Sequence, residues 1–179
     1  FGVSSSAGVP ESFAKETIVV PLNDRIALSQ AFEIYPNQIA AVIIEPIPAN
    51  NGLLLQDASF LEYLRQICTQ NNALLIFDEV ISGFRVGFEG AAGHYNVKPD
   101  IITFGKIIGG GMPVGAYGAS KEIMRFISPD GPVYQAGTLS GNPVAMAAGA
   151  AQLTECLQPN FYENLAQNTQ NFVQHINQH

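Results

Sequence analysis

A single lysine, Lys106, stands where an apolar segment passes into a glycine-rich one. Residues 101–104 precede it, and residues 107–111 after it contain three glycines. A lysine ammonium among such neighbours has little water around it, which favours the neutral amine that attacks carbonyl carbon. The alternative is a lysine whose stem packs while its ammonium reaches solvent. The sequence alone therefore predicts either a carbonyl-binding lysine or an ordinary surface lysine.

An aspartate, Asp78, ends a second apolar run upstream. Residues 73–77 are all apolar, and Asp78 follows them directly. Taken alone, this acid could be a turn residue or a helix cap. Together with a lysine after the next strand, it matches what pyridoxal 5'-phosphate requires. An aspartate keeps the pyridine nitrogen protonated, and a lysine holds the aldehyde and moves protons. We therefore expect Asp78 and Lys106 to bind the two ends of one cofactor, with Lys106 catalytic.

Two further residues are candidates for cofactor contacts. Val80 lies two positions past the acid and is expected to pack on the cofactor ring. Thr138 lies just before a predicted helix start, where a hydroxyl and backbone amides suit a phosphate. Its alternative role is that of an ordinary loop residue at a helix entry. A nucleotide-binding loop does not fit, because Lys106 is followed by Ile107 rather than Ser or Thr.

Apolar blocks and amphipathic segments alternate along the chain. Such blocks without internal alternation are typical of parallel strands buried on both faces, so we expect an α/β fold with a mostly parallel sheet flanked by helices. Ligands of such sheets gather at the carboxyl ends of the strands, where Glu45, Asp78 and Lys106 stand. Strands are predicted at residues 17–20, 39–44, 73–77, 100–104 and 114–118, helices at 24–35, 57–71, 142–157 and from 161 on, and loops at 1–10 and 82–96.

The two ends of the chain suggest a piece of a longer protein. It begins at Phe1 without a methionine and stops at His179 inside a helical pattern. We expect residues 1–157 to be a cofactor-binding large domain that is incomplete at its N-terminus. Residues 158–179 would then begin a truncated, smaller C-terminal domain.

Composition narrows the classes of partner. The formal net charge is −7 and Lys plus Arg number eight, which argues against nucleic acid and anionic membranes. No run of about 18 apolar residues and no signal-like start occurs, so we expect a cytoplasmic protein without a membrane span. Cys68 and Cys156 are expected to be reduced thiols on helix faces. The three histidines share no ligand spacing, so no metal site is expected.

Three segments resemble the class III pyridoxal-phosphate-dependent aminotransferases. They are residues 77–85 (FDEVISGFR), 99–118 (PDIITFGKIIGGGMPVGAYG) and 134–143 (YQAGTLSGNP). The resemblance extends over nearly the whole chain. The third segment favours the aminomutase branch of the family, which converts glutamate 1-semialdehyde to 5-aminolevulinate for tetrapyrrole synthesis.

This resemblance implies a fold-type I transferase large domain and a role for each candidate residue. Lys106 would carry the cofactor covalently, Asp78 would bind the pyridine nitrogen, and Val80 would back the ring. Thr138 would reach the phosphate of the neighbouring subunit's cofactor, in a homodimer with shared active sites acting on a small amino or aldehyde substrate. Residues 6–10 resemble the end of the family's gating loop.

One segment leaves the reaction open. Residues 45–52 read EPIPANNG, whereas the pattern associated with the aminomutase branch at this place is EPVAGNMG. The alternative is a class III aminotransferase that uses an external amino donor. A third possibility is a homologue without catalysis that serves only as a folding or dimerisation unit.

Overall fold

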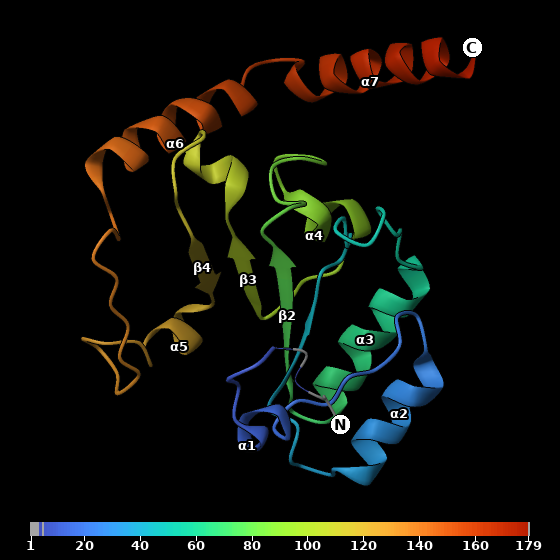
Figure 1. The fold of residues 1–179 in the computed structure, drawn as a ribbon, viewed down its shortest axis with the longest axis vertical. Helices are drawn as coiled ribbons and strands as arrows, with labels where there is room; N and C mark the ends of the chain where they lie inside the picture. The colour runs from blue at the N-terminus through green and yellow to red at the C-terminus, as the bar shows by residue number, and fades with distance from the viewer. Residues whose placement is uncertain (1–3, 5, 179) are drawn as a thin grey trace.

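The computed structural model describes residues 4 and 6–178 (Figure 1). In chain order the elements are α1 (Glu11–Ala14), α2 (Arg25–Ile34), β1 (Ala41–Ile44), α3 (Ala58–Gln70), β2 (Leu74–Glu79), α4 (Gly90–Tyr95), β3 (Ile101–Phe104), the 3-10 helix η1 (Lys106–Gly109), β4 (Ala116–Ala119), α5 (Lys121–Met124), α6 (Pro143–Cys156) and α7 (Phe161–Asn177).

Within this part of the chain, the four strands form one sheet in the order β1, β2, β3, β4. The first three strands are parallel, with Ile44 beside Phe77 and Phe77 beside Ile102. β4 runs antiparallel to β3, with Phe104 beside Ala116. The connection through η1 is short and turns straight back, whereas a parallel neighbour requires a longer crossover. The predicted α/β fold with a mostly parallel sheet flanked by helices is confirmed.

The hydrophobic core lies between one face of the sheet and helices α2 and α3. Leu75 and Phe77 of β2 are fully buried against Leu61 and Leu64 of α3. Burying each such side chain stabilises the fold by about 1.5–3 kcal/mol. The buried positions of α3 repeat at helical spacing, as the sequence predicted: Phe60, Leu61, Leu64, Ile67 and Cys68.

Short polar side chains begin three of the helices. The carboxylate of Asp24 accepts a hydrogen bond from Ala27 N at 2.9 Å, and that of Asp57 accepts one from Ser59 N at 2.9 Å. Asn142 caps α6 in the same way. These bonds satisfy amides that have no partner inside the helix.

Residues 17–20 do not form the predicted strand. Val19 is 69 % exposed, and no strand among the described residues pairs with this segment. Strand propensity depends on packing against neighbours, so β-branched residues without a partner strand do not suffice.

The predicted loops also need correction. Residues 82–96 are not wholly loop, because they contain α4. Residues 6–10 form a turn with neither helix nor strand, while residues 1–3 and 5 of the predicted N-terminal loop lie outside the described residues. Periodicity did not reveal α4 because it is short and rich in glycine and alanine, and because a buried carboxylate from β2 starts it.

Helices α6 and α7 lie across the carboxyl ends of the parallel strands (Figure 1). α6 packs on η1, the 3-10 helix that begins with Lys106. α7 extends past the body of the fold and buries none of its residues among those described. The carboxyl edge is therefore bordered by α4, η1 and α6.

Candidate functional site

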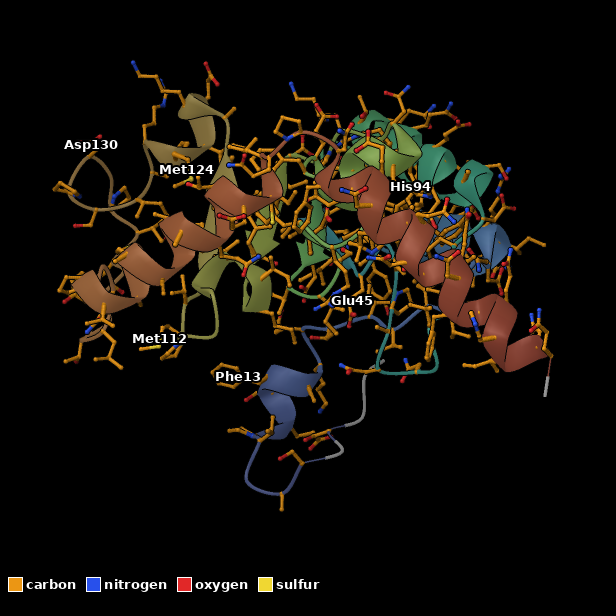
Figure 2. The ribbon with its side chains drawn as sticks, turned by 90° about the horizontal axis from the view of Figure 1, so that it is seen from above. Phe13, Glu45, His94, Met112, Met124 and Asp130 are labelled. Carbon is orange, nitrogen blue, oxygen red and sulfur yellow. The ribbon has the colours of Figure 1, made fainter. Side chains whose placement is uncertain are left out.

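The carboxyl edge of the three parallel strands holds the three polar residues that the sequence placed there. Glu45 directly follows β1, Asp78 is the second-last residue of β2, and Lys106 follows β3 after one glycine. Figure 2 looks down on this end of the sheet, and in that view Glu45 lies between α6 and α7. The topology therefore gathers these residues from separate segments of sequence.

Asp78 is half-buried and holds a fixed orientation. Its Oδ1 accepts hydrogen bonds from Val80 N at 3.0 Å and from Thr103 Oγ1 at 3.4 Å. Thr103 is the residue directly beside Asp78 on β3. Oδ2 has no partner among the described residues, so it is free to accept a hydrogen bond from a ligand. This geometry suits a carboxylate that receives a ring N–H.

Val80 lies against the glycine that precedes the lysine. A Cβ added at Gly105 would lie 3.2 Å from Val80 Cγ1, which is closer than ordinary van der Waals contact. Gly105 is buried, and only a residue without a side chain leaves this approach unstrained. The structure therefore brings Val80 next to the lysine turn, and its contact with a cofactor ring stays a prediction.

Lys106 sits in an unusual backbone conformation. Its φ is +46°, in the left-handed region that residues other than glycine rarely adopt. Such strain costs on the order of 1–3 kcal/mol and clusters at functional sites. Among residues 4 and 6–178, no hydrogen bond or ion pair engages its ammonium. Within the described residues, the Lys106 amine therefore contributes no polar contact that stabilises the fold.

The expected exclusion of water from Lys106 is not found. Its side chain is exposed, although Gly105 and Gly109 on either side are buried. The residue stands in a left-handed conformation two positions after the end of β3. Apolar neighbours in sequence therefore did not predict its exposure.

Helix α6 fixes the lysine turn by close backbone contact. A Cβ at Gly149 would collide with Ile108 O of η1, and one at Gly110 would lie 2.5 Å from Ala148 O of α6. Gly110 has φ +56°, so it needs glycine for its conformation as well. Gly149 in α6 and Gly110 in the turn are thus required for this close contact between α6 and the segment that carries Lys106.

Thr138 is not brought to this edge. It lies in the irregular segment before α6, its side chain is exposed, and it makes no side-chain hydrogen bond within the described part of the chain. Its expected role concerned the cofactor of a neighbouring subunit, so that role stays a prediction.

Two residues that matter to the site were missed from sequence. Thr103 bonds Asp78, and Glu79 is buried on the opposite face of β2 with its carboxylate on α4. The strict alternation along a strand would have revealed Glu79, because it places Asp78 and Glu79 on opposite faces. Asp78 and Glu79, although adjacent in sequence, therefore lie in different environments on the two faces of β2. Thr103 could not be found from this alternation, because its place beside Asp78 depends on the register between β2 and β3.

The loop after β1 contains an unpaired buried group. Gln56 is 5 % exposed, and its Nε2 donates to Glu45 O at 3.4 Å, whereas Oε1 has no partner among the described residues. Glu45 itself is half-buried. This loop includes the segment that departs from the aminomutase pattern.

A tyrosine ties the start of α7 to the loop beside the site. Tyr162 Oη donates to Phe84 O at 3.0 Å, and the Phe84 ring packs on Phe104, with centroids 5.2 Å apart. Burial, with a smaller contribution from Cys156, raises the pKa of Tyr162 to about 12. The phenol therefore stays a neutral donor.

An apolar cavity of about 710 Å³ lies between α6 and the β3–β4 region, lined by residues such as Phe84, Phe104 and Met146. Neither Asp78 nor Lys106 lines it, so it is separate from the candidate site.

In the described chain no three His, Cys, Asp or Glu side chains gather to hold a metal ion. Of the described helices, none has the length and apolarity that crossing a membrane needs.

Comparison with known proteins gives a consistent picture. The family described as Aminotransferase class-III matches residues 5–179. The chain is 57 % identical over 168 residues to a glutamate-1-semialdehyde 2,1-aminomutase of Legionella pneumophila, covering 94 % of this chain and 39 % of that protein. The chain thus spans about two fifths of the length of this curated relative.

Solved structures of transaminases share the fold. An omega-transaminase from Sphaerobacter thermophilus has a TM-score of 0.80 at 39 % identity, covering 87 % of this chain and 36 % of that one. A transaminase with PLP (pyridoxal phosphate) bound has a TM-score of 0.81 at 34 % identity, covering 88 % and 37 %. The fold-type expectation is therefore confirmed.

Proposed function

The chain belongs to the aminotransferase class III family, and from this premise we propose that it is part of a pyridoxal-phosphate-dependent aminomutase converting glutamate 1-semialdehyde to 5-aminolevulinate. The similarity to an enzyme of that name supports the substrate. The observation that carries the proposal is the meeting of Asp78, with a free carboxylate oxygen, and Lys106, with a free ammonium, at one sheet edge.

The residues present fit the cofactor. Asp78 Oδ2 suits a protonated ring nitrogen, and Val80 lies so close to Gly105 that a side chain at position 105 would press on it. When bound, pyridoxal phosphate supplies an aldehyde that bonds amines and a ring that accepts the electron pair released at carbon. The chain's own residues must then hold that ring and move protons.

Each residue takes one task under this proposal. Asp78 would accept the hydrogen bond of the pyridine N–H and stabilise its positive charge, while Thr103 and Val80 N fix the direction of the carboxylate. Val80 packs on one ring face. Lys106 would hold the cofactor covalently, and its amine would take and return the proton at the substrate carbon.

Assembly and location follow as proposals from the same family membership. We place residues 1–157 in the cofactor-binding large domain and residues 158–179 at the start of a C-terminal domain. Thr138, exposed in this chain, would contact the phosphate of a partner subunit's cofactor in a homodimer with shared sites. Residues 6–10 would be part of a gating loop, and the enzyme would be cytoplasmic.

A second candidate is a class III aminotransferase that takes its amine from an external donor. Residues 45–52 favour it, because they differ from the pattern associated with the aminomutase, and the loop they begin lies beside the carboxyl edge. The solved transaminase structures show that the same fold serves that reaction. A homologue without catalysis would retain the fold but not use Lys106.

The experiment that separates these reactions uses the intact protein loaded with the cofactor. It is incubated with glutamate 1-semialdehyde and no amino donor, and 5-aminolevulinate is followed. Sustained product formation is expected of the aminomutase. Turnover that appears only when an amine and a keto acid are added would instead establish the aminotransferase. A protein that takes up no cofactor would be the non-catalytic homologue.

A further inference from the structure

The one fully buried acid of the described chain has no task in the proposed mechanism. Glu79 follows Asp78 on β2 but faces the opposite side of the sheet, and it is 0 % exposed. Within residues 4 and 6–178 no Lys, Arg or His forms an ion pair with it. A buried carboxylate without a cation persists only where hydrogen bonds replace its water.

Three donors take the place of that water. Glu79 Oε2 accepts from Ala91 N at 2.6 Å and from Ser82 Oγ at 3.0 Å, and Oε1 accepts from Ala92 N at 2.9 Å. The two amides belong to the first turn of α4, where backbone N–H groups lack partners inside the helix. One side chain thus fastens both the loop after β2 and the helix that follows.

The Glu79 carboxylate occupies the space beside Gly90 that a side chain at that position would need. Gly90 has φ +65°, and a Cβ added there would collide with Glu79 Oε2. The backbone carbonyl of Glu79 also accepts a hydrogen bond from Gly83 N at 2.9 Å. Main chain and side chain of Glu79 therefore hold the same segment together.

A carboxylate offers acceptors on both of its oxygens, so it satisfies all three donors. In a glutamine at position 79, the amide oxygen can take one of the two acceptor positions. The NH₂ group then faces either Ala91 N–H or Ala92 N–H, and one buried backbone donor is left against another donor. Glutamine, although of the same shape, is therefore predicted to loosen this end of β2.

The loosened end is the one that aligns the cofactor acid. Glu79 is the last residue of β2, and the next residue, Val80, donates its N–H to Asp78 Oδ1. A shift of Val80 N alters this bond and turns Asp78 Oδ2, the oxygen that faces a ligand. The two adjacent acids are linked in this way through one backbone amide.

We propose that Glu79 is a positioning residue for the cofactor site. Fixed on α4 and Ser82, it holds Val80 N where it directs the Asp78 carboxylate toward the cofactor's pyridine nitrogen. This inference rests on the proposed function, since it needs a bound pyridoxal phosphate, and it adds a residue that does not touch the cofactor.

The test compares four variants of the intact protein: Glu79→Gln, Ser82→Ala, Asp78→Asn and, as control, Arg65→Ala. Arg65 forms an ion pair at the opposite end of β2, through Asp100, which also accepts from Leu75 N. For each protein, the dissociation constant for pyridoxal phosphate and the pH midpoint of its visible absorption band at saturating cofactor are measured. Thermal unfolding without cofactor reports stability alone.

Glu79→Gln is expected to weaken cofactor binding by about tenfold, the effect of one unpaired buried donor. Its pH midpoint should move in the same direction as that of Asp78→Asn, and by less. Ser82→Ala keeps the charge and two of the three bonds, so it should move the midpoint in that direction by a smaller amount. Arg65→Ala should lower thermal stability and leave the midpoint in place.

Two results would overturn the inference. In one, Glu79→Gln loses stability but keeps the midpoint of the unaltered protein, as Arg65→Ala does. In the other, Glu79→Gln moves the midpoint while Ser82→Ala does not, so that charge and not position is responsible. If Glu79→Gln does not fold, Ser82→Ala alone decides by its midpoint. The proposed function fails separately, when the unaltered protein shows no visible band with the cofactor.

Discussion

Replacing Gly149 by alanine tests whether α6 fixes the lysine turn. Gly149 lies in the interior of α6, where alanine is normally the better helix former by about 1 kcal/mol. In this structure, however, the added Cβ would collide with Ile108 O of η1 and lie 3.3 Å from Ile108 C. Helix propensity and packing therefore predict opposite signs for one substitution.

The packing effect should exceed the propensity effect. Overpacking costs about 1–3 kcal/mol, and the upper end applies because both sides of the collision are backbone. After about 1 kcal/mol of helix propensity is subtracted, Gly149→Ala should destabilise the protein by about 2 kcal/mol. Because the strain is relieved by moving η1, Lys106 should also be displaced, and a misplacement of about 1 Å lowers turnover by about a hundredfold.

Thermal unfolding of the intact protein without cofactor, followed by circular dichroism, measures the stability change, and kcat measures the displacement. Gly87→Ala is the matched control, since a Cβ at Gly87 meets nothing within 4 Å. The control should change the free energy of unfolding by no more than about 0.5 kcal/mol. A Gly149→Ala variant that melts at a higher temperature than the unaltered protein would refute the reasoning.

Three further predictions follow. Asp78→Asn keeps the shape of the side chain but removes its charge, so kcat/KM should fall by about 10²-fold or more, and a value near normal would exclude the assigned role. Arg65→Ala breaks a half-buried ion pair of 2.7 Å to Asp100, which also holds Leu75 N, and urea unfolding should show a loss of about 1 kcal/mol. Burial raises the pKa of Cys68 to about 11, so its thiol stays protonated near pH 8. It should therefore react with a thiol reagent only after the protein is denatured. Reaction in the native protein would contradict its burial.

Most of the fold was predictable because its signals are local. Continuous apolar blocks marked β1, β2 and β3, and short polar residues at the right offsets marked the starts of α2, α3 and α6. These cues depend on few residues and act over one or two turns. The antiparallel course of β4 was not predicted, since it depends on how η1 turns the chain.

Other elements depend on contacts between distant residues. Residues 17–20 have the composition of a strand but no partner strand in the described chain. α4 has little helical periodicity and begins on the carboxylate of Glu79, which lies more than ten positions upstream. Neither outcome can be read from a local window of sequence.

The candidate site was predicted in its residues more than in its surroundings. The positions of Asp78 and Lys106 at one sheet edge follow from the parallel course of their strands, which the apolar blocks predicted. Neither the exposure of Lys106 nor its backbone φ of +46° is indicated by the pattern of apolar residues around it. The support of Asp78 by Thr103 requires the register between β2 and β3.

The most direct test of the central claim locates the covalent bond between protein and cofactor. The intact protein is loaded with pyridoxal phosphate and reduced with borohydride, and its peptides are mapped by mass spectrometry. The phosphopyridoxyl group is predicted on Lys106, and Lys106→Ala should carry none while losing several orders of magnitude in turnover. Attachment to another lysine, such as Lys98 or Lys121, in a catalytically active protein would contradict the account.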